Sequence, residues 1–471
     1  MTNQIMLKTR NTALYEALKL FVVEAFQVLV KVIGNGAKVP MITEFCWQPG
    51  GPAASFLRTQ ITRPEYWLLI HEVSESIKEL AAYEQAKTAI QEDQLWCSHM
   101  DKLVGSAMGS RRLGIDDVLR GILAHHLMET DQFDLSEAYF DEHVDRLEAF
   151  FHSSTVEYIR TTPLYGVTLQ KSLSFSDAVS IEPLSDSEIL HFLNAGLISS
   201  DFYGSHDFVH NSPRAAMVSR FSMPKVIRGD HDPAETNLQA VTEVWNRLTV
   251  DESMAIDLLT LHLDARIAPA GSITKSQWLM DGSSQIQKNA IANAWALQGK
   301  PLTEEASDKF SRLWSVLNDS SKKSRHFLAI AVRRFALAMS RPSLDDKLID
   351  LMICAEAIFL RVDMNELTYK LAHRAALLLG ETPTQQADIF KFIKEAYAMR
   401  SKVVHGNKSY ARDPKDAEQL SLIIAKLSDY LRQALLKMFA LALNPQAHSE
   451  LINWNDLMFC GTTPLDIPSL N

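Results

Sequence analysis

The sequence predicts a mainly α-helical protein, with a mixed α+β region between two helical regions. Apolar residues recur at helical spacing before about residue 155 and after about residue 303, whereas short alternating runs broken by Gly and Pro follow residue 160. The 46% of apolar and 22% of charged residues are typical of a globular chain that buries a large core. The chain divides into a helical N-terminal region (1–158), a mixed region (159–300), a helical domain (301–445) and a C-terminal tail (446–471).

The N-terminal region is predicted to begin with a long core helix. Asn11 suits the N-cap, and Gly34 and Gly36 suit the end of a helix that runs to Ile33. Charged and polar residues interrupt its apolar stretch, so it fits an amphipathic helix better than a membrane span of about 20 apolar residues. Helical spacing resumes after the break at WQPGGP, and we expect the whole region to be helical.

The mixed region is predicted to hold short strands, loops and one helix between residues 160 and about 235. The sequence Ser185-Asp186-Ser187-Glu188 contains the Ser and Glu of a capping box, which marks the start of that helix. A longer helix is expected at about 240–265. One more is expected within 268–300, after a Pro/Gly break.

The helical domain is predicted to contain six helices. Their expected ranges are 304–318, 322–340, 345–360, 366–379, 384–404 and a last helix that ends near Leu443. The third is apolar on nearly all sides, so we expect it at the centre of the bundle. Asp413 and Pro414 suit the N-cap and the first position of the last helix.

The composition excludes several classes of protein. Four widely spaced cysteines form no CxxC pair, so neither a disulfide framework nor a zinc finger is indicated, and a cytoplasmic location is expected. No signal peptide and no membrane association are expected. The net charge of −10 is unevenly distributed. From residue 301 onward there are 22 Lys and Arg residues and 20 Asp and Glu residues, whereas residues 1–300 contain 25 Lys and Arg and 37 Asp and Glu. An anionic ligand is therefore better placed in the C-terminal part.

The stretch AYAMRSKVVHGNKSY, residues 396–410, places Arg400 and His405 at the end of a predicted helix, just before Gly406. Five residues turn an ideal helix so far that the two side chains point about 140° apart. One helix does not easily aim both at one atom, but a second copy across a two-fold axis brings in the same motif. The simpler interpretation is that both cations only cap the last carbonyls of the helix.

The residues around this pair resemble the R-x(4–6)-H motif of HEPN domains, and in particular the Apea-like HEPN group. That group shows a Tyr three residues before the Arg, then Arg-Ser and Val-His-Gly, which correspond here to Tyr397, Arg400, Ser401, Val404, His405 and Gly406. Three upstream segments are similar in the same order: AVRRFALAMSR (331–341), DKLIDLMICAEAIFL with Glu356, and YKLAHRAALLLG (369–380) with Arg374. A looser similarity begins at TPLYGVTL (162–169).

The resemblance implies a helical-bundle endoribonuclease that works as a homodimer and needs neither a metal nor another cofactor. Arg400 and His405 would be its catalytic pair. In this chemistry the RNA 2′-OH attacks the adjacent phosphate and leaves a 2′,3′-cyclic phosphate and a 5′-OH. His405 suits the general acid or base, and Arg400 suits the charge of the phosphate. Similar proteins act in anti-phage defence, abortive infection or toxin-like growth arrest, so a phage-derived trigger or a regulatory partner is expected at residues 1–300.

Other residues of the motif are expected to support this pair. Glu356 lies on an apolar helix and needs a partner if it is buried, so Arg374 or Arg400 is expected to pair with it. Glu356 would then orient a cation rather than act as a catalyst, and Tyr397 belongs with these orienting residues.

Ser401 either hydrogen-bonds the phosphate or caps the helix. Lys402, Asn407 and Lys408 are candidate contacts to RNA, for which a solvated loop is the alternative. The alternative to the enzyme is a non-catalytic HEPN scaffold, which dimerises, binds RNA or a nucleotide and serves a partner protein.

No phosphate loop, dinucleotide-binding or nucleophile-elbow motif is present.

Three groups of His, Cys, Asp and Glu residues have a simpler structural interpretation than metal binding or catalysis. A metal site would need more than the two ligands that a His and a Glu one helical turn apart supply. The groups are His125 with Glu129, Cys97 with His99, and His206 with Asp207 and His210.

Overall fold

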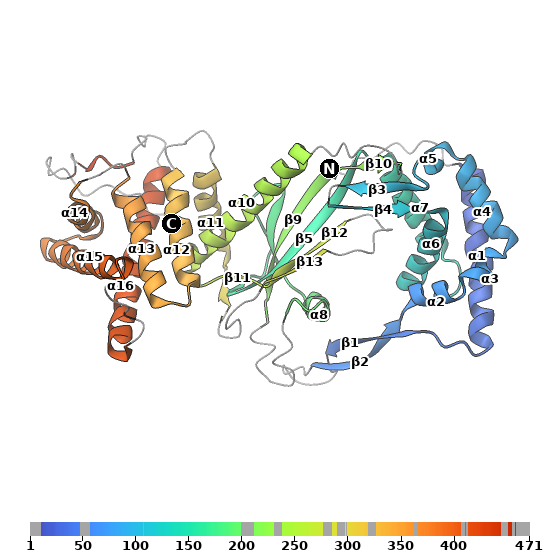
Figure 1. The fold of residues 1–471 in the computed structure, drawn as a ribbon, viewed down its shortest axis with the longest axis horizontal. Coiled ribbons are helices and arrows are strands. Elements are labelled where there is room, and N and C mark those ends of the chain that lie inside the picture. The colour runs from blue at the N-terminus through green and yellow to red at the C-terminus, as the bar shows by residue number, and fades with distance from the viewer. Residues whose placement is uncertain are drawn as a thin grey trace.

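The computed structural model describes residues 11–47, 57–106, 108–198, 212–229, 238–276, 285–289, 297, 299–318, 326–361, 365–406, 410, 413–443, 451–454 and 457. These residues are mainly helical, as predicted, and form an elongated molecule (Figure 1). A helical N-terminal lobe and a C-terminal helical bundle lie on either side of an antiparallel sheet. Within these ranges, no helix combines the length and the apolar character that crossing a bilayer requires.

The N-terminal lobe packs around the helix α1 (Thr12–Gly34). Asn11 caps it as predicted, because its side-chain oxygen accepts from the amide of Leu14 at 3.3 Å. The lobe has its own core, in which Phe21, Trp96 and Phe140 are almost fully buried. Its other helices are α2 (Tyr66–Glu72), α3 (Ser74–Lys78), α4 (Ala81–Glu92), α5 (Gln94–Cys97), α6 (Ile115–Thr130) and α7 (Glu137–His152).

The expectation of a wholly helical N-terminal region is wrong, because the lobe also contains two β-hairpins. They are β1 (Met41–Trp47) with β2 (Leu57–Pro64), and β3 (Lys102–Ser106) with β4 (Gly109–Leu113). Each strand has eight residues or fewer, which is too short for periodicity to separate strand from helix. At Gly105 the carbonyl oxygen of Gly109 lies only 2.2 Å from where a Cβ would stand, so the second hairpin requires glycine there.

The central sheet is built on the long strands β5 (Thr155–Tyr165) and β9 (Ala215–Pro224), which pair antiparallel from Thr155 opposite Pro224 to Leu164 opposite Ala215. The strand order is β13-β12-β5-β9-β8-β7, with β11 also on β5. The shorter strands of this sheet are β7 (Leu173–Ser174), β8 (Val179–Pro183), β11 (Ala268–Pro269), β12 (Gly271–Ser276) and β13 (Gln285–Lys288). Two other strands, β6 (Val167–Thr168) and β14 (Lys300–Pro301), form a separate parallel pair, and β10 (Val226–Arg228) belongs to the sheet of β3 and β4.

The two predicted helices of this region are present as α8 (Asp186–Asn194) and α10 (Leu238–Leu263). The capping box at Ser185 and Glu188 is confirmed. The further helix expected within 268–300 is not found in the described part of that range, where residues 268–276 and 285–288 contain strands. Residues 290–296 lie outside the described residues.

Several contacts join the N-terminal lobe to the sheet, among them a buried hydrogen bond of 2.6 Å between the hydroxyls of Ser106 and Tyr158. Strand β10 pairs with β3 of the lobe. The Lys225 ammonium donates to the carbonyl oxygens of Phe150 and Phe151 at 2.7 and 2.9 Å, at the C-terminal end of α7. A cation is favourable there because the last carbonyls of a helix carry partial negative charge.

The six predicted helices of the C-terminal bundle are confirmed, with ends within a few residues of those expected. They are α11 (Glu304–Asn318), α12 (His326–Ser340), α13 (Leu344–Phe359), α14 (Leu367–Leu379), α15 (Pro383–Val404) and α16 (Pro414–Leu443). Helix α13 lies centrally, with Leu348, Ala355 and Ile358 fully buried. The core is continuous with the sheet, since one apolar cluster includes Leu164 of β5 and Phe439 of α16.

Candidate functional site

Helix α15 positions the Arg400–His405 segment. The helix begins with a capping box, in which the Thr382 side chain accepts from the amide of Gln385 at 3.3 Å. It ends at Val404, so that His405 is the C-cap residue. Gly406 follows with φ of 69°, the left-handed conformation that commonly ends a helix and favours glycine. The predicted end of the helix is therefore confirmed.

Arg400 is directed from α15 toward the central helix α13. Its Nη2 atom lies 3.9 Å from Oε1 of Glu356, and the two side chains are only 23% and 27% exposed. The guanidinium carbon also lies 5.8 Å from the centre of the Tyr397 ring, a cation–π distance. The Nε atom of Arg400 is buried without a hydrogen-bond partner among the described residues. Glu356 and Tyr397 thus orient a guanidinium whose donors they do not use up.

The charges around Arg400 also act on Tyr397. Burial raises the pKa of the Tyr397 hydroxyl, and the nearby negative charge of Glu356 raises it further against the opposing effect of Arg400. The phenol therefore stays protonated at neutral pH. Tyr397 can orient Arg400 and donate a hydrogen bond, but it does not supply a base.

His405 lies at the exposed end of the same helix. Its backbone amide donates to the Ser401 carbonyl at 3.1 Å, and the residue is exposed to solvent. Among the contacts of the described residues, none joins the side chains of Arg400 and His405. Within one chain the two side chains therefore face different surroundings, as the angle of about 140° between them predicts.

The other predicted site residues lie around this segment. Of the two candidate partners of Glu356, Arg400 forms the ion pair, whereas Arg374 donates from Nη1 to the Phe359 carbonyl at the end of α13 at 2.5 Å. The Arg374 guanidinium also lies 5.5 Å from the Trp454 ring centre. Ser401 is half-buried and Lys402 is exposed, while Asn407 and Lys408 lie outside the described residues.

Comparisons of the chain with protein-family models, with curated proteins and with solved structures found no match. The assignment of the Arg400 segment thus rests on its sequence motif and on the contacts described above.

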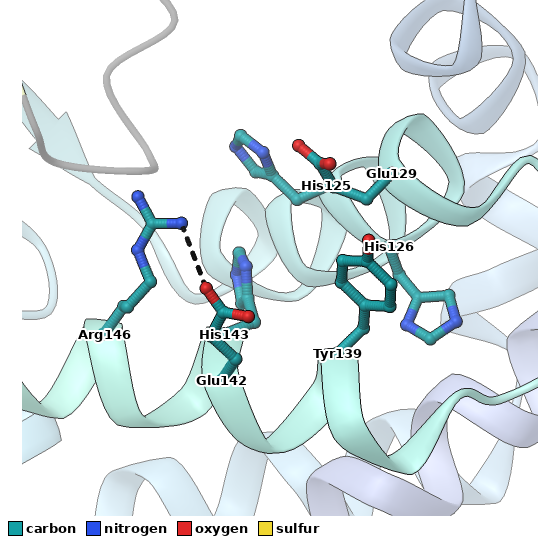
Figure 2. A pocket seen from close by; sticks show the side chains of 7 residues that line it. All are labelled: His125, His126, Glu129, Tyr139, Glu142, His143 and Arg146. Carbon is teal, nitrogen blue, oxygen red and sulfur yellow. Dashed lines mark ion pairs between the residues drawn. The ribbon is translucent and has the colours of Figure 1, made fainter.

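A second concentration of polar side chains lies in the N-terminal lobe, between α6 and α7 (Figure 2). It surrounds a cavity of about 240 Å³. The α7 residues recur every three or four positions and so share one face of that helix. The lining residues are His125, His126 and Glu129 from α6, and Tyr139, Glu142, His143 and Arg146 from α7.

The cavity holds an uncharged, buried His143 beside the ring of His125. The rings of His125 and His143 lie 5.3 Å apart, and the Nε2 atom of His143 is buried without a hydrogen-bond partner among the described residues. Burial lowers the pKa of His143 to about 3, and the neighbouring His125 and Arg146 contribute to this. In the described part of the chain, no three His, Cys, Asp or Glu side chains are grouped to hold a metal ion, so the His125–Glu129 pair does not form one there.

Among the remaining candidate site residues, His99 has a structural role and three others lie outside the described residues. The His99 ring is only 3% exposed and packs on Phe151, with its Nδ1 atom 3.0 Å from the Leu95 carbonyl oxygen. Cys97 is exposed. His206, Asp207 and His210 lie outside the described residues.

The sequence interpretation passed over His143, and also Tyr369 and His373 on α14. Both groups of residues follow a simple pattern in the sequence. His143 belongs to a polar stripe beside the apolar stripe of α7, and Tyr369 and His373 are one helical turn apart. A search for polar or aromatic residues at helical spacing on the outer faces would have found them.

Proposed function

We propose that the C-terminal helical domain is a metal-independent endoribonuclease of the HEPN type. The observation that carries the proposal is the orientation of Arg400, which Glu356 and Tyr397 hold five residues before the exposed His405 on the same helix. A guanidinium held in place before substrate binds can stabilise charge on a phosphate without further reorganisation.

The expected reaction needs only groups that this segment offers. The RNA 2′-oxygen forms a bond to phosphorus, the bond from phosphorus to the 5′-oxygen breaks, and the cyclic phosphate and a 5′-OH remain. One proton leaves the 2′-OH and another reaches the 5′-oxygen. An imidazole such as that of His405 suits either transfer near neutral pH. Arg400 is the group proposed to hold the phosphate oxygens.

A dimer would bring the two cations together. Arg400 faces α13 and His405 lies at the helix end, so a site that needs both is more readily completed by a second chain. Val404, next to His405, is 50% exposed and offers an apolar contact at such an interface. We expect the cleavage to serve anti-phage defence or growth arrest, with a trigger or regulatory partner acting on the N-terminal lobe and the sheet.

The alternative is a non-catalytic scaffold that dimerises and binds RNA or a nucleotide for a partner protein. The observation that favours it is the lack of contact between Arg400 and His405 within one chain.

RNA cleavage in EDTA distinguishes the two proposals. For the enzyme, Arg400→Ala and His405→Ala should each lower the cleavage rate by about a hundredfold or more, and the product should carry a 2′,3′-cyclic phosphate. An exposed control, Lys415→Ala at the start of α16, should cleave at the wild-type rate. Cleavage that survives both substitutions would remove these residues from the mechanism.

Mixing the two inactive variants tests the composite site directly. In a mixed dimer, one of the two sites would contain the intact Arg400 of one chain and the intact His405 of the other. Activity should therefore return on mixing, toward a fraction of the wild-type rate. If each site is built within one chain, the mixture stays inactive.

A further inference from the structure

A group of aromatic rings with one exposed member lies on α15, the helix that carries Arg400, and on its neighbour α14. Tyr369 is 53% exposed, and its ring is nearly parallel to that of His373, with 5.7 Å between the centroids and 12° between the planes. Phe390 of α15 meets Tyr369 edge to face at 5.6 Å. We term Tyr369, His373 and Phe390 the aromatic cluster. The exposed face of Tyr369 offers a flat ring to a ligand.

Positive charge lies beside this cluster on α15. The Lys394 ammonium is 5.4 Å from the Phe390 ring centre. Helical geometry places Phe390, Lys394 and Tyr397 within about 60° of one another, whereas Asp388 and Glu395 point about 140–160° away from Phe390. The face of α15 that continues the aromatic cluster is thus basic and aromatic, and these two carboxylates lie on the opposite side.

The cluster is also continuous with the proposed catalytic segment. Ten residues of α15 separate Phe390 from Arg400, which is about 15 Å along the helix axis. At about 3.4 Å per nucleotide, the rise of one strand in a stacked duplex, roughly four nucleotides span that distance, and an extended unpaired strand needs fewer. A strand bound at the cluster can therefore reach Arg400 without a change in the fold.

We propose that the aromatic cluster is a binding site for an unpaired base of single-stranded RNA, with Tyr369 as the stacking surface and Lys394 as a phosphate contact. The inference rests on the proposed function, and names the form of RNA that the site would take. Unpaired bases expose π-faces to aromatic side chains, whereas the bases of a duplex are stacked on one another and unavailable. A ring for the base and an ammonium for the backbone are the two groups that such a strand requires.

Fluorescence anisotropy with a labelled, unpaired oligoadenylate tests the site in the full-length protein. The His405→Ala background prevents cleavage during the measurement. Tyr369→Ala should weaken binding about tenfold, and Tyr369→Phe should retain it because the ring stays. Tyr139→Ala is the matched control, since Tyr139 is 42% exposed but lies in the N-terminal lobe. Lys394→Gln should weaken binding and lower the salt slope by about one.

Three outcomes overturn the inference: no binding of the oligoadenylate, equal affinity of Tyr369→Ala and wild type, or tighter binding of a fully paired hairpin. Thermal melts of the variants identify any loss of folding, and Tyr369→Phe repeats the test in a protein with the same ring. The result is separable from the proposed function. Binding that depends on Tyr369, without any cleavage, supports this site and contradicts the enzyme. Cleavage at the same rate with and without the Tyr369 ring supports the enzyme and contradicts this site.

Discussion

The imidazole of His143 makes the stability of the N-terminal lobe depend on pH. Burial lowers its pKa from 6.5 to about 3 in the folded chain. Between these values the unfolded chain binds a proton that the folded chain does not, so stability is lost as pH falls below about 6.5. The loss approaches about 1.4 kcal/mol for each pH unit in that window.

Replacing His143 with Leu should therefore flatten the pH dependence of folding between pH 6 and 4. The free energy of unfolding, measured by urea titration at several pH values, should fall less steeply in the variant than in the wild type. Tyr139→Leu, on the same face of α7, removes no group that titrates in this window and should keep the wild-type slope. Equal slopes for His143→Leu and wild type would show that His143 is accessible to protons in the folded lobe.

At the scale of single elements, a buried carboxylate joins α12 to α13. Asp350 is 3% exposed and accepts from Arg334 Nη1 at 2.9 Å and from Arg341 Nε at 2.8 Å. About two-fifths of each arginine side chain is exposed to solvent. The arginines therefore lose less hydration free energy on folding than the buried carboxylate of Asp350 does. The pair of bonds fixes how α12 and the turn after it lie on the central helix.

Removing this carboxylate should weaken the bundle. Asp350→Ala deletes both ion pairs and leaves a small void, and we expect a loss of about 2–3 kcal/mol in the free energy of unfolding, below the usual cost for fully buried pairs. Arg334→Ala removes one of two bonds and should cost about 1 kcal/mol. Denaturant titration of the full chain gives both values. A loss for Asp350→Ala no greater than that for Arg334→Ala would show that Arg341 contributes nothing.

The helices could be predicted from sequence much better than the strands. The six bundle helices have long apolar stripes, and the caps at Asn11, Ser185 and Asp413 are local signals that packing does not override. The hairpins of the N-terminal lobe are short, and β10 pairs with β3 more than 100 residues away. Such pairing depends on tertiary contacts that no window of sequence contains.

The same distinction holds for the candidate site. The helix end at His405 and Gly406 follows from local sequence. The sequence leaves open whether Glu356 pairs with Arg400 or with Arg374, because the answer depends on how α13 and α15 approach each other. The cavity at His143 and the Tyr369 surface likewise arise where two helices meet, so spacing on one helix could suggest their residues but not their surroundings.

At the scale of the whole molecule, the described chain has two large apolar cores. One lies within residues 14–151, and the other joins the sheet to the bundle from Leu164 to Ile452. Between them run the β10–β3 pairing, the bonds of Lys225 to the end of α7, the short link from α7 into β5, and a small apolar cluster in which Phe150 of the lobe packs against residues of the sheet. Contacts of this limited extent hold the two parts together more weakly than either core holds itself.

We therefore expect the chain to unfold in two transitions, each sensitive to its own core. Phe21→Ala in the N-terminal core and Phe439→Ala in the C-terminal core each remove a fully buried ring, at a cost of about 3–5 kcal/mol. In differential scanning calorimetry each should lower the temperature of one transition by about 10 °C and leave the other in place. Lys225→Met should separate the two transitions further, because it removes a connection without touching either core. A single transition that both Phe variants lower equally would mean that the lobe and the rest of the chain fold as one cooperative unit.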